Sequence, residues 1–264
     1  MSESETPVLL KTDGAIARIL FNRPKVLNAL SVDAAVAFHD ACKRVAADKS
    51  IRVVVIAGEG RAFMAGGDVS AFGGPVEEGR ARIRTIMDPL HDGLELLAGL
   101  AAPVIASLHG PVAGAGASIA FATDLAIAAD NVVFNLAYSK LGTSPDGSAT
   151  FSLPRLVGLR KAMEIALMSD NIDAHEALRL GLVNTIVPAA ELVAETDKLA
   201  KRLADGPTFA FGQTKALLRG SLDRSMHDQM IAEGDAFRAC MGTADFAEGV
   251  GAFLGKRAAT FKGS

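Results

Sequence analysis

The sequence predicts an α/β protein, and three observations lead to that prediction. Two short apolar runs flank Asp13-Gly14, a dipeptide typical of the turn in a two-stranded hairpin. Apolar or β-branched runs at 51–57 and 103–108 are typical of strands buried on both faces, and helix-like stretches follow them. From Ala190 onward only helix-like segments remain. Strand, strand and helix in repeated order, followed by helices, indicates an α/β fold with a helical C-terminal part.

The N-terminal third is expected to hold a hairpin, a helix, a buried strand and a second, longer helix. Ser31 has the residue type of an N-cap, which places the start of the first helix directly after it. The second helix is expected to break or kink at Pro89. In order, the predicted elements are strands at 8–10 and 15–21, a helix from Ser31 to about Ala47, a strand at 51–57 and a helix from Val76 to about Leu100.

The stretch from Pro103 to Gly147 is the segment around which the rest of the chain is organised. It contains no Asp, Glu, Lys or Arg before Asp124, but prolines and glycines interrupt it, which favours a buried core segment over a membrane span. Its elements are predicted to be a strand at 103–108, a turn at His109-Gly110-Pro111, a helix of small residues at 112–122, strands at 125–129 and 132–134, and an acidic loop that ends at Gly147.

The C-terminal half is predicted to be mostly helical. Asp173 and Glu176 have the spacing of a capping box at the start of one helix, and Gly181 has the residue type that ends it. A helix at 161–169 precedes this one and a short strand at 182–187 follows it. We expect a core domain at 1–205 and a C-terminal helical region at 206–264, because Asp205-Gly206-Pro207 interrupts the helices there.

Composition narrows the class of protein. The 264 residues are enough for a large core, and a net charge of −3 without a basic run does not suggest nucleic acid as a partner. Cys42 and Cys240 are far apart, so no disulfide framework is indicated and a reducing compartment is expected. The N-terminus lacks an apolar leader, and we therefore expect a cytoplasmic protein. No cluster has metal-ligand spacing, so no metal is expected.

Two glycine-bearing turns each follow a buried strand, at 65–68 and at 114–116. One backbone N–H from each turn can hold a carbonyl oxygen that gains negative charge. The alternative is a pair of purely structural turns, and spacing by itself favours that alternative. Other motifs fail on single residues: Ile119 stands where a dinucleotide loop needs its third glycine, and Ser118 is not in a nucleophile elbow.

Four motifs in the correct order resemble the crotonase (enoyl-CoA hydratase/isomerase) superfamily: Asn22–Leu30, Arg61–Asp68, His109–Gly116 and Phe253–Arg257. The resemblance implies a spiral of ββα units with a C-terminal helical trimerisation part, assembled as a homotrimer or as a hexamer formed by two trimers. It also implies an acyl-CoA thioester as the substrate, so that coenzyme A arrives with the substrate and no separate cofactor is expected. On the family pattern, the oxyanion donors are the N–H groups of Gly67 and Ala115.

The departures from the family pattern bear on the reaction. The two glutamates of a family hydratase fall at Ser118 and Tyr138 here, and neither residue is a carboxylate. Asp146 resembles the single aspartate of family isomerases, and also the attacking aspartate of the 4-chlorobenzoyl-CoA dehalogenase branch. In that branch a His and a Trp have spacings matched here by His91 and Tyr138. Alternatively, Asp146 holds a turn, His91 is a solvated helix residue, and Tyr138 either fills the pocket or hydrogen-bonds Asp146.

The same resemblance implies a binding site for coenzyme A. Lys256 matches a family lysine that reaches the 3′-phosphate from a neighbouring subunit, and the alternative is a surface cation. The remaining residues expected to line the pantetheine and adenine sites are Lys25, Val26, Ala62, Met64, Ala65 and Asp68.

An enoyl-CoA isomerase is the leading hypothesis, because one base suffices for moving a double bond and one carboxylate is present. Three alternatives stay open. The first is an aryl-CoA dehalogenase, which the missing Trp weakens, and the second is an enoyl-CoA hydratase. The third is a non-catalytic crotonase-fold protein that binds coenzyme A, RNA or a protein. Two oxyanion turns argue against lost catalysis, and the absence of a basic cluster argues against RNA.

Overall fold

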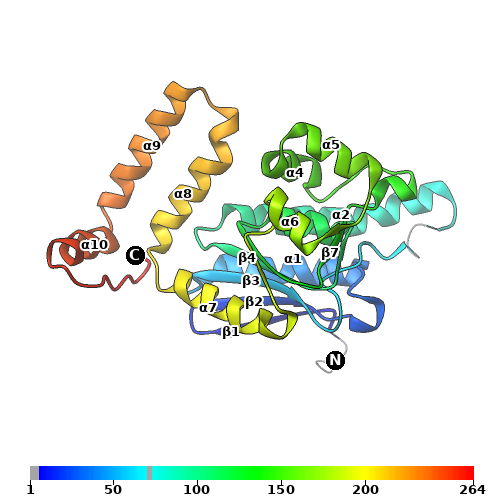
Figure 1. The fold of residues 1–264 in the computed structure, drawn as a ribbon, viewed down its shortest axis with the longest axis horizontal. Helices are drawn as coiled ribbons and strands as arrows, with labels where there is room; N and C mark the ends of the chain where they lie inside the picture. Colours follow the sequence, from blue (N-terminus) through cyan, green and yellow to red (C-terminus); the bar gives the residue numbers. More distant parts are fainter. Residues whose placement is uncertain (1–5, 70–72) are drawn as a thin grey trace.

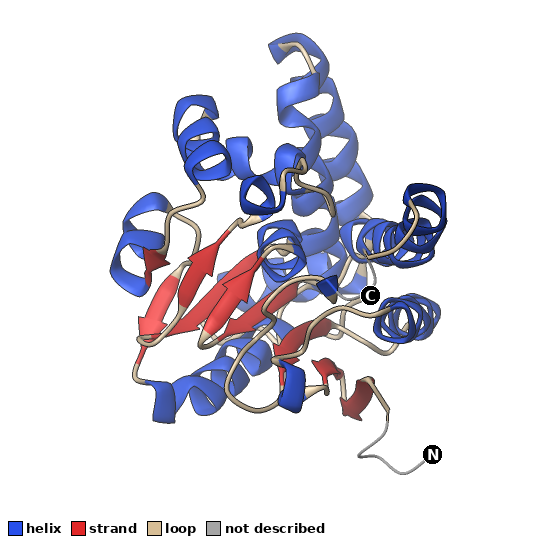
Figure 2. Cartoon of the chain, turned by 90° about the vertical axis from the view of Figure 1, so that its right-hand side faces the viewer, coloured by secondary structure: helices blue, strands red, loops and turns tan. Residues whose placement is uncertain are grey.

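A six-stranded sheet forms the centre of the computed structural model, which describes residues 6–69 and 73–264 (Figure 1, Figure 2). The strand order is β1-β2-β3-β4-β6-β9. β1 and β2 are antiparallel and form the predicted hairpin, whereas the other neighbours are parallel. The bounds are Val8–Asp13 for β1, Ile16–Phe21 for β2, Val53–Gly58 for β3, Val104–Leu108 for β4, Leu125–Ala129 for β6 and Thr185–Val187 for β9.

Alternation along β3 shows how both faces of this sheet are buried. Val54 and Ile56 point into the main core, while Val53 and Val55 point to the opposite face. The helix α7 (Leu192–Ala204) covers that opposite face. This two-sided burial explains why the strand is apolar at successive positions, as the sequence predicts for a central parallel strand.

A second sheet holds the strand that the sequence assigned to a helix. Its order is β5-β7-β8, with bounds Pro111–Ala113 for β5, Val133–Asn135 for β7 and Ile172–Asp173 for β8. The prediction of a helix over 112–122 is wrong at its start. Val112 pairs with Phe134 in β7 and with Met64, and α3 (Ala115–Ala122) begins only after Gly114. The backbone of Gly114 has φ 47°, a conformation outside the helix.

The first two helices pack against each other on the main core. α1 (Val32–Ala47) begins where the sequence predicts, because the Ser31 side chain accepts a hydrogen bond from the N–H of Ala34 at 3.3 Å. α2 (Val76–Gly99) continues through Pro89, so of the predicted break or kink the break is wrong. Ile86 and Leu90 on either side of the proline are buried, and this packing holds the helix together across the lost hydrogen bond.

Three shorter helices lie between β7 and β9. Asp173 caps α6 (Ala174–Leu180) by accepting from the N–H of Glu176 at 2.9 Å, and Gly181 ends the helix with φ 77°. The Glu176 carboxylate pairs with Arg179, so the capping box forms on one side only. α5 (Leu159–Met168) matches its prediction closely, whereas the sequence assigned no element to α4 (Ala149–Val157).

The chain ends in a helical unit that we call the arm, which comprises residues 206–264. It contains α8 (Thr208–Gly220), α9 (Met226–Met241) and α10 (Ala244–Leu254). Figure 1 shows α8 and α9 as an antiparallel pair beside the rest of the molecule. Asp124 anchors α8 to the core through Lys215 at 2.6 Å and Arg219 at 2.8 Å, and all three side chains are largely buried or half-buried.

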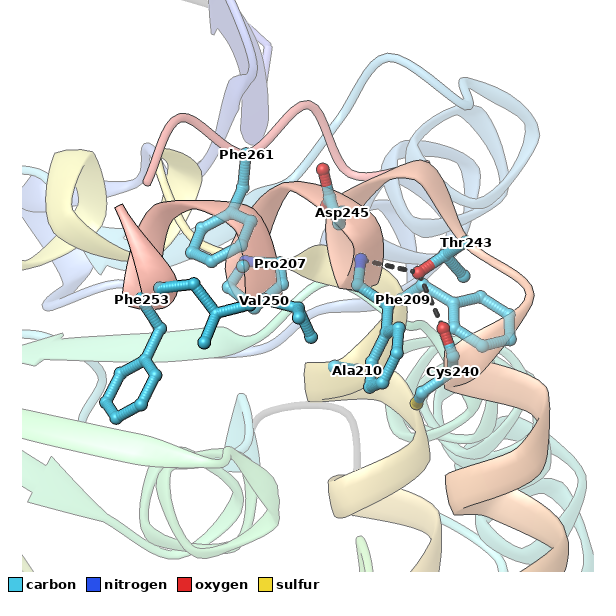
Figure 3. Close-up of a pocket in the computed structure, with 12 residues that line it drawn as sticks. Pro207, Phe209, Ala210, Cys240, Thr243, Asp245, Val250, Phe253 and Phe261 are labelled. Atoms are coloured by element: carbon cyan, nitrogen blue, oxygen red, sulfur yellow. Dashed lines mark hydrogen bonds between the residues drawn. The ribbon is translucent and has the colours of Figure 1, made fainter. Parts of the chain in front are cut away.

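A cavity of about 390 Å³ lies inside the arm (Figure 3). Its lining is mainly aromatic and aliphatic, with Phe209, Phe246, Phe253 and Phe261 among the residues. None of the residues predicted to act on an acyl group lines this cavity. Among the described residues, no helix is both long and apolar enough to cross a membrane.

Candidate active site

The two glycine-bearing turns predicted from the sequence lie in backbone contact. Met64 donates to the carbonyl of Pro111 at 3.2 Å, and its own carbonyl accepts from Ala113 at 2.8 Å. A Cβ at Gly116 would lie 2.6 Å from the Met64 carbonyl oxygen, and a Cβ at Gly114 would lie 3.3 Å from Cα of Gly66. Larger residues at these glycines would therefore push the turns apart.

Each turn offers an unpaired backbone N–H. Leu30 bridges the first turn by donating to Gly66 at 2.8 Å and accepting from Asp68 at 2.9 Å, which leaves the N–H of Gly67 pointing the other way. Ala115 is the first residue of α3, where helical N–H groups have no partner within the helix. Neither N–H has an acceptor within the described part of the chain. Both predicted oxyanion donors are thus available to a ligand.

Two predicted site residues, Tyr138 and Asp146, form a connected group with Ser118 of α3. Tyr138 lies on the 3₁₀ turn η4 (Tyr138–Leu141), and its hydroxyl donates to Oδ1 of Asp146. The same phenolic oxygen lies 3.0 Å from Oγ of Ser118, which is fully buried in α3. Of the two roles left open for Tyr138, the structure shows the hydrogen bond to Asp146.

Tyr138 is held as a neutral hydrogen-bond donor. Burial raises its pKa, and the nearby charge and hydrogen bond of Asp146 raise it further, whereas the hydrogen bond with Ser118 lowers it. The net shift of the pKa is upward, which favours the protonated phenol. Asp146 is half-buried, and no described donor contacts its Oδ2, which is therefore the oxygen available to a substrate.

His91 lies beside the same loop. Its Nε2 is 3.4 Å from the N–H of Gly147, the residue that follows Asp146. Gly147 has φ 57°, and a Cβ there would lie 3.1 Å from Ser118 and 3.3 Å from Leu90. The loop that carries Asp146 is therefore pressed against both α2 and α3, and His91 is part of the group rather than a solvated helix residue.

The segment expected to bind coenzyme A packs on the first turn. Lys25 and Val26 lie on η2 (Pro24–Val26), and Val26 is 48% exposed. Asn28 fixes this segment, because its buried amide nitrogen donates to three carbonyls on the neighbouring loop, including Ala62 at 2.8 Å. Ala62 and Met64 are themselves fully buried, so neither residue presents exposed surface to a ligand in this structure.

The other expected ligand-binding residues occupy different surroundings. Ala65 donates to the carbonyl of Leu27 at 3.0 Å, and Asp68 pairs with Arg23 at 3.4 Å. Lys256 lies two residues beyond the end of α10, and Figure 1 shows α10 in the arm, away from α2 and α4. The structure thus gathers the predicted residues of the first turn but does not bring Lys256 to the site of its own chain.

Sequence reasoning missed two residues of this site. Ser118 was noted as a departure from the hydratase pattern, but its link to Tyr138 depends on how α3 meets η4, and no local signal shows it. Asn28 was part of a quoted motif, and its positive φ of 57° suits an asparagine. No group of three or more His, Cys, Asp or Glu among the described residues has the geometry of a metal site.

The comparison with known families decides the identity. The sequence model of the enoyl-CoA hydratase/isomerase family matches residues 11–264. This chain belongs to the enoyl-CoA hydratase/isomerase family. It is therefore an acyl-CoA-processing enzyme of the crotonase superfamily, which confirms the resemblance found in the motifs.

Relatives in this family have different activities. The chain is 33% identical to 1,2-epoxyphenylacetyl-CoA isomerase of Escherichia coli (strain K12), over 97% of this chain and 98% of that protein. It is 32% identical to 4-chlorobenzoyl coenzyme A dehalogenase-2 of Arthrobacter sp, over 93% and 89%. A solved enoyl-CoA hydratase from Polaromonas sp. JS666 superposes with a TM-score of 0.88 at 30% identity, over 97% and 99%. The crotonase-like fold with a C-terminal helical region is confirmed.

Proposed function

We propose that this enzyme is an enoyl-CoA isomerase that moves a double bond along the acyl chain of a coenzyme A thioester. The observation that carries this proposal is the single carboxylate, Asp146, held by Tyr138 next to the turn that carries Ala115. A hydratase of the expected kind needs a paired acid and base. The positions of that pair are occupied here by Ser118 and Tyr138, which form hydrogen bonds but carry no carboxylate.

The proposed reaction uses the two halves of the site in turn. Oδ2 of Asp146 takes a proton from Cα of a β,γ-unsaturated thioester, and the thioester oxygen becomes the oxygen of a dienolate. The N–H groups of Gly67 and Ala115 hold that negative oxygen. The protonated Asp146 then returns a proton at Cγ, which leaves an α,β-unsaturated thioester and the original carboxylate. Hydrogen moves only as a proton, so the proposed reaction requires neither a redox cofactor nor a metal.

Tyr138 orients the base in this reaction. Its hydroxyl occupies Oδ1 of Asp146, which leaves Oδ2 to face the substrate. Because its pKa is raised, Tyr138 stays protonated and continues to donate in both states of the carboxyl group. This arrangement limits the rotation of Asp146 between its two steps.

Aryl-CoA dehalogenation is the second candidate, because His91 contacts the residue after Asp146. In that reaction Asp146 attacks an aromatic carbon, halide leaves, and water activated by His91 cleaves the resulting aryl ester. The Trp expected in this branch is absent, and the chain has no Trp at all. Nε2 of His91 also faces the backbone N–H of Gly147, which supports a role for His91 in holding the loop that carries Asp146.

Turnover in water enriched in heavy oxygen separates the two reactions. We expect the enzyme to isomerise a 3-enoyl-CoA, to release no halide from 4-chlorobenzoyl-CoA and to leave Asp146 unlabelled. His91→Gln should then change the isomerisation rate little. Heavy oxygen in the Asp146 carboxylate after many turnovers, or halide release that depends on His91, would overturn the isomerase proposal in favour of the dehalogenase.

We propose further that the protein assembles as a homotrimer or as a hexamer formed by two trimers. The support is the exposed apolar surface of the arm, where Phe253 is 83% exposed and Leu254 75%. Lys256 is then placed to reach the 3′-phosphate of coenzyme A on a neighbouring subunit. Titration calorimetry should show weaker acyl-CoA binding for Lys256→Ala, whereas removal of the phosphate from the ligand should abolish the difference.

A further inference from the structure

Ser118 touches both halves of the site, although the reaction as described does not use it. Its Oγ lies 3.0 Å from the phenolic oxygen of Tyr138 and 3.3 Å from the carbonyl oxygen of Gly114. The single hydroxyl proton of Tyr138 is donated to Asp146. In its bond with Tyr138, Ser118 must therefore be the donor. The fully buried Ser118 hydroxyl thus has one proton and two acceptors.

The two acceptors lead to the two halves of the reaction. Tyr138 connects Ser118 to the base, Asp146. The carbonyl of Gly114 belongs to the same planar peptide group as the N–H of Ala115, which is one of the two oxyanion donors. A hydrogen bond to that carbonyl polarises the whole peptide group and makes its N–H a stronger donor.

Enolate formation changes the strengths of these acceptors in opposite directions. When Asp146 takes up a proton, it loses its charge and draws less on the Tyr138 hydroxyl, so the phenolic oxygen becomes a weaker acceptor. In the same step, negative charge develops against the N–H of Ala115, and the carbonyl of Gly114 becomes a stronger acceptor. Both changes favour a hydrogen bond from Ser118 to Gly114.

We propose that Ser118 is a positioning residue whose hydroxyl shifts its hydrogen bond from Tyr138 to the carbonyl of Gly114 as the enolate forms. Ser118 then couples the base to the oxyanion-binding peptide. This inference rests on the proposed isomerase function. An interaction that strengthens only in the intermediate raises kcat and leaves the binding of the unreacted substrate unchanged.

Binding measurements with Ser118→Ala test this coupling without turnover. Acetoacetyl-CoA enolises readily and serves as the probe for enolate binding, while butanoyl-CoA is a saturated thioester of similar size. We expect wild-type protein to prefer acetoacetyl-CoA, and the variant to lose about fivefold of that preference, the size of one neutral hydrogen bond. Ser107→Ala is the matched control, because Ser107 is also buried but lies away from the site. Its Oγ forms a hydrogen bond of 2.9 Å with the hydroxyl of Thr196.

Two further readouts separate coupling from a loss of structure. Ser118→Ala should lower kcat about fivefold with KM unchanged, whereas Ser107→Ala should alter only thermal stability. Tyr138 is the sole tyrosine, so tyrosine labelled with carbon-13 gives one ring-carbon signal from the site. That signal should move in Ser118→Ala and stay in place in Ser107→Ala.

The binding measurements distinguish a failure of the proposed function from a failure of the coupling through Ser118. If wild-type protein binds acetoacetyl-CoA no more tightly than butanoyl-CoA, the enolate site is absent, and the proposed function falls together with this inference. If wild-type protein shows the preference and Ser118→Ala retains it, only the coupling through Ser118 is overturned.

Discussion

Among the described phenylalanines, the most buried lie in the core and the most exposed lie in the arm. Phe21, Phe38 and Phe63 are buried in the core, where the rings of Phe21 and Phe38 stack with centroids 5.6 Å apart. In the arm, Phe237 is 63% exposed and Phe253 is 83% exposed. These three rings of the core are therefore buried within one chain, whereas these two rings of the arm are presented outward. Whether an apolar residue of the sequence is buried thus depends on how many chains assemble together.

The polar groups show the reverse contrast. The core places Asp146, Tyr138 and Ser118 in one hydrogen-bonded group at a site that faces a ligand. In the arm, by contrast, the buried carboxylate of Asp245 accepts hydrogen bonds from backbone N–H groups of the arm itself. The donors are Lys262 at 2.6 Å and Gly263 at 2.8 Å. The chemistry should therefore reside in the core, and assembly should reside in the arm.

Replacing the base gives the largest expected effect and tests the core side of this contrast. Asp146→Asn keeps the shape of the side chain and removes its ability to accept a proton, so isomerisation of a 3-enoyl-CoA should fall by at least ~10²-fold. The oligomeric state should not change. Asp92→Asn is the control, because it removes a charge from an exposed position one residue from His91. Full activity in Asp146→Asn would exclude Asp146 as the base.

Introducing a charge on the exposed apolar face of the arm tests whether the arm mediates assembly. Each apolar side chain buried between copies contributes about 2 kcal/mol, so Leu254→Asp should weaken association by roughly 30-fold or more. Sedimentation equilibrium at micromolar concentration should show a shift toward monomer. Val36→Asp, at a 42% exposed position on α1, should leave the assembly intact. A wild-type monomer would show that the arm is not an interface.

The junction between the two regions should be costly to break. Asp124→Asn leaves Lys215 and Arg219 without their counter-charge in a largely buried position, which should lower the free energy of unfolding by about 3 kcal/mol. Asp205→Asn removes an exposed pair with Lys201 and should change it by well under 1 kcal/mol. Denaturant titration measures both variants. Equal effects would mean that the buried cluster does not hold the arm in place.

The smallest effect concerns the tail of the arm. Arg257 and the N–H of Thr260 bond the Glu248 carboxylate and lower its pKa from 4.5 to about 2. A lowered pKa in the folded state contributes stability above pH 4.5, and this contribution is lost as the pH falls toward 2. Glu248→Gln should therefore be slightly less stable than wild type at pH 6 and equal to it near pH 2. A difference that persists at pH 2 would have another origin.

Local signals account for the parts of the fold that the sequence predicted correctly. The Asp13-Gly14 hairpin, the Ser31 cap and the Gly181 helix end are each determined by a few neighbouring residues. β5 was missed because Val112 adopts an extended conformation only through pairing with Phe134 and Met64, which are distant in sequence. The family motifs and their spacing predicted the candidate site residues, but the hydrogen bond between Ser118 and Tyr138 depends on tertiary packing alone.

The contacts that attach α8 to the core determine how precisely the far end of the arm is positioned. Thr208, Lys215 and Arg219 bond the core, and a Cβ at Gly212 would lie 2.6 Å from Ala101. These contacts span about 16 Å of helix. Because α8 is attached along this length and not at a single residue, the arm has little freedom to rotate against the core. An arm attached in this way can hold Lys256 at a fixed place against a neighbouring molecule, which a flexible linker of the same length cannot do.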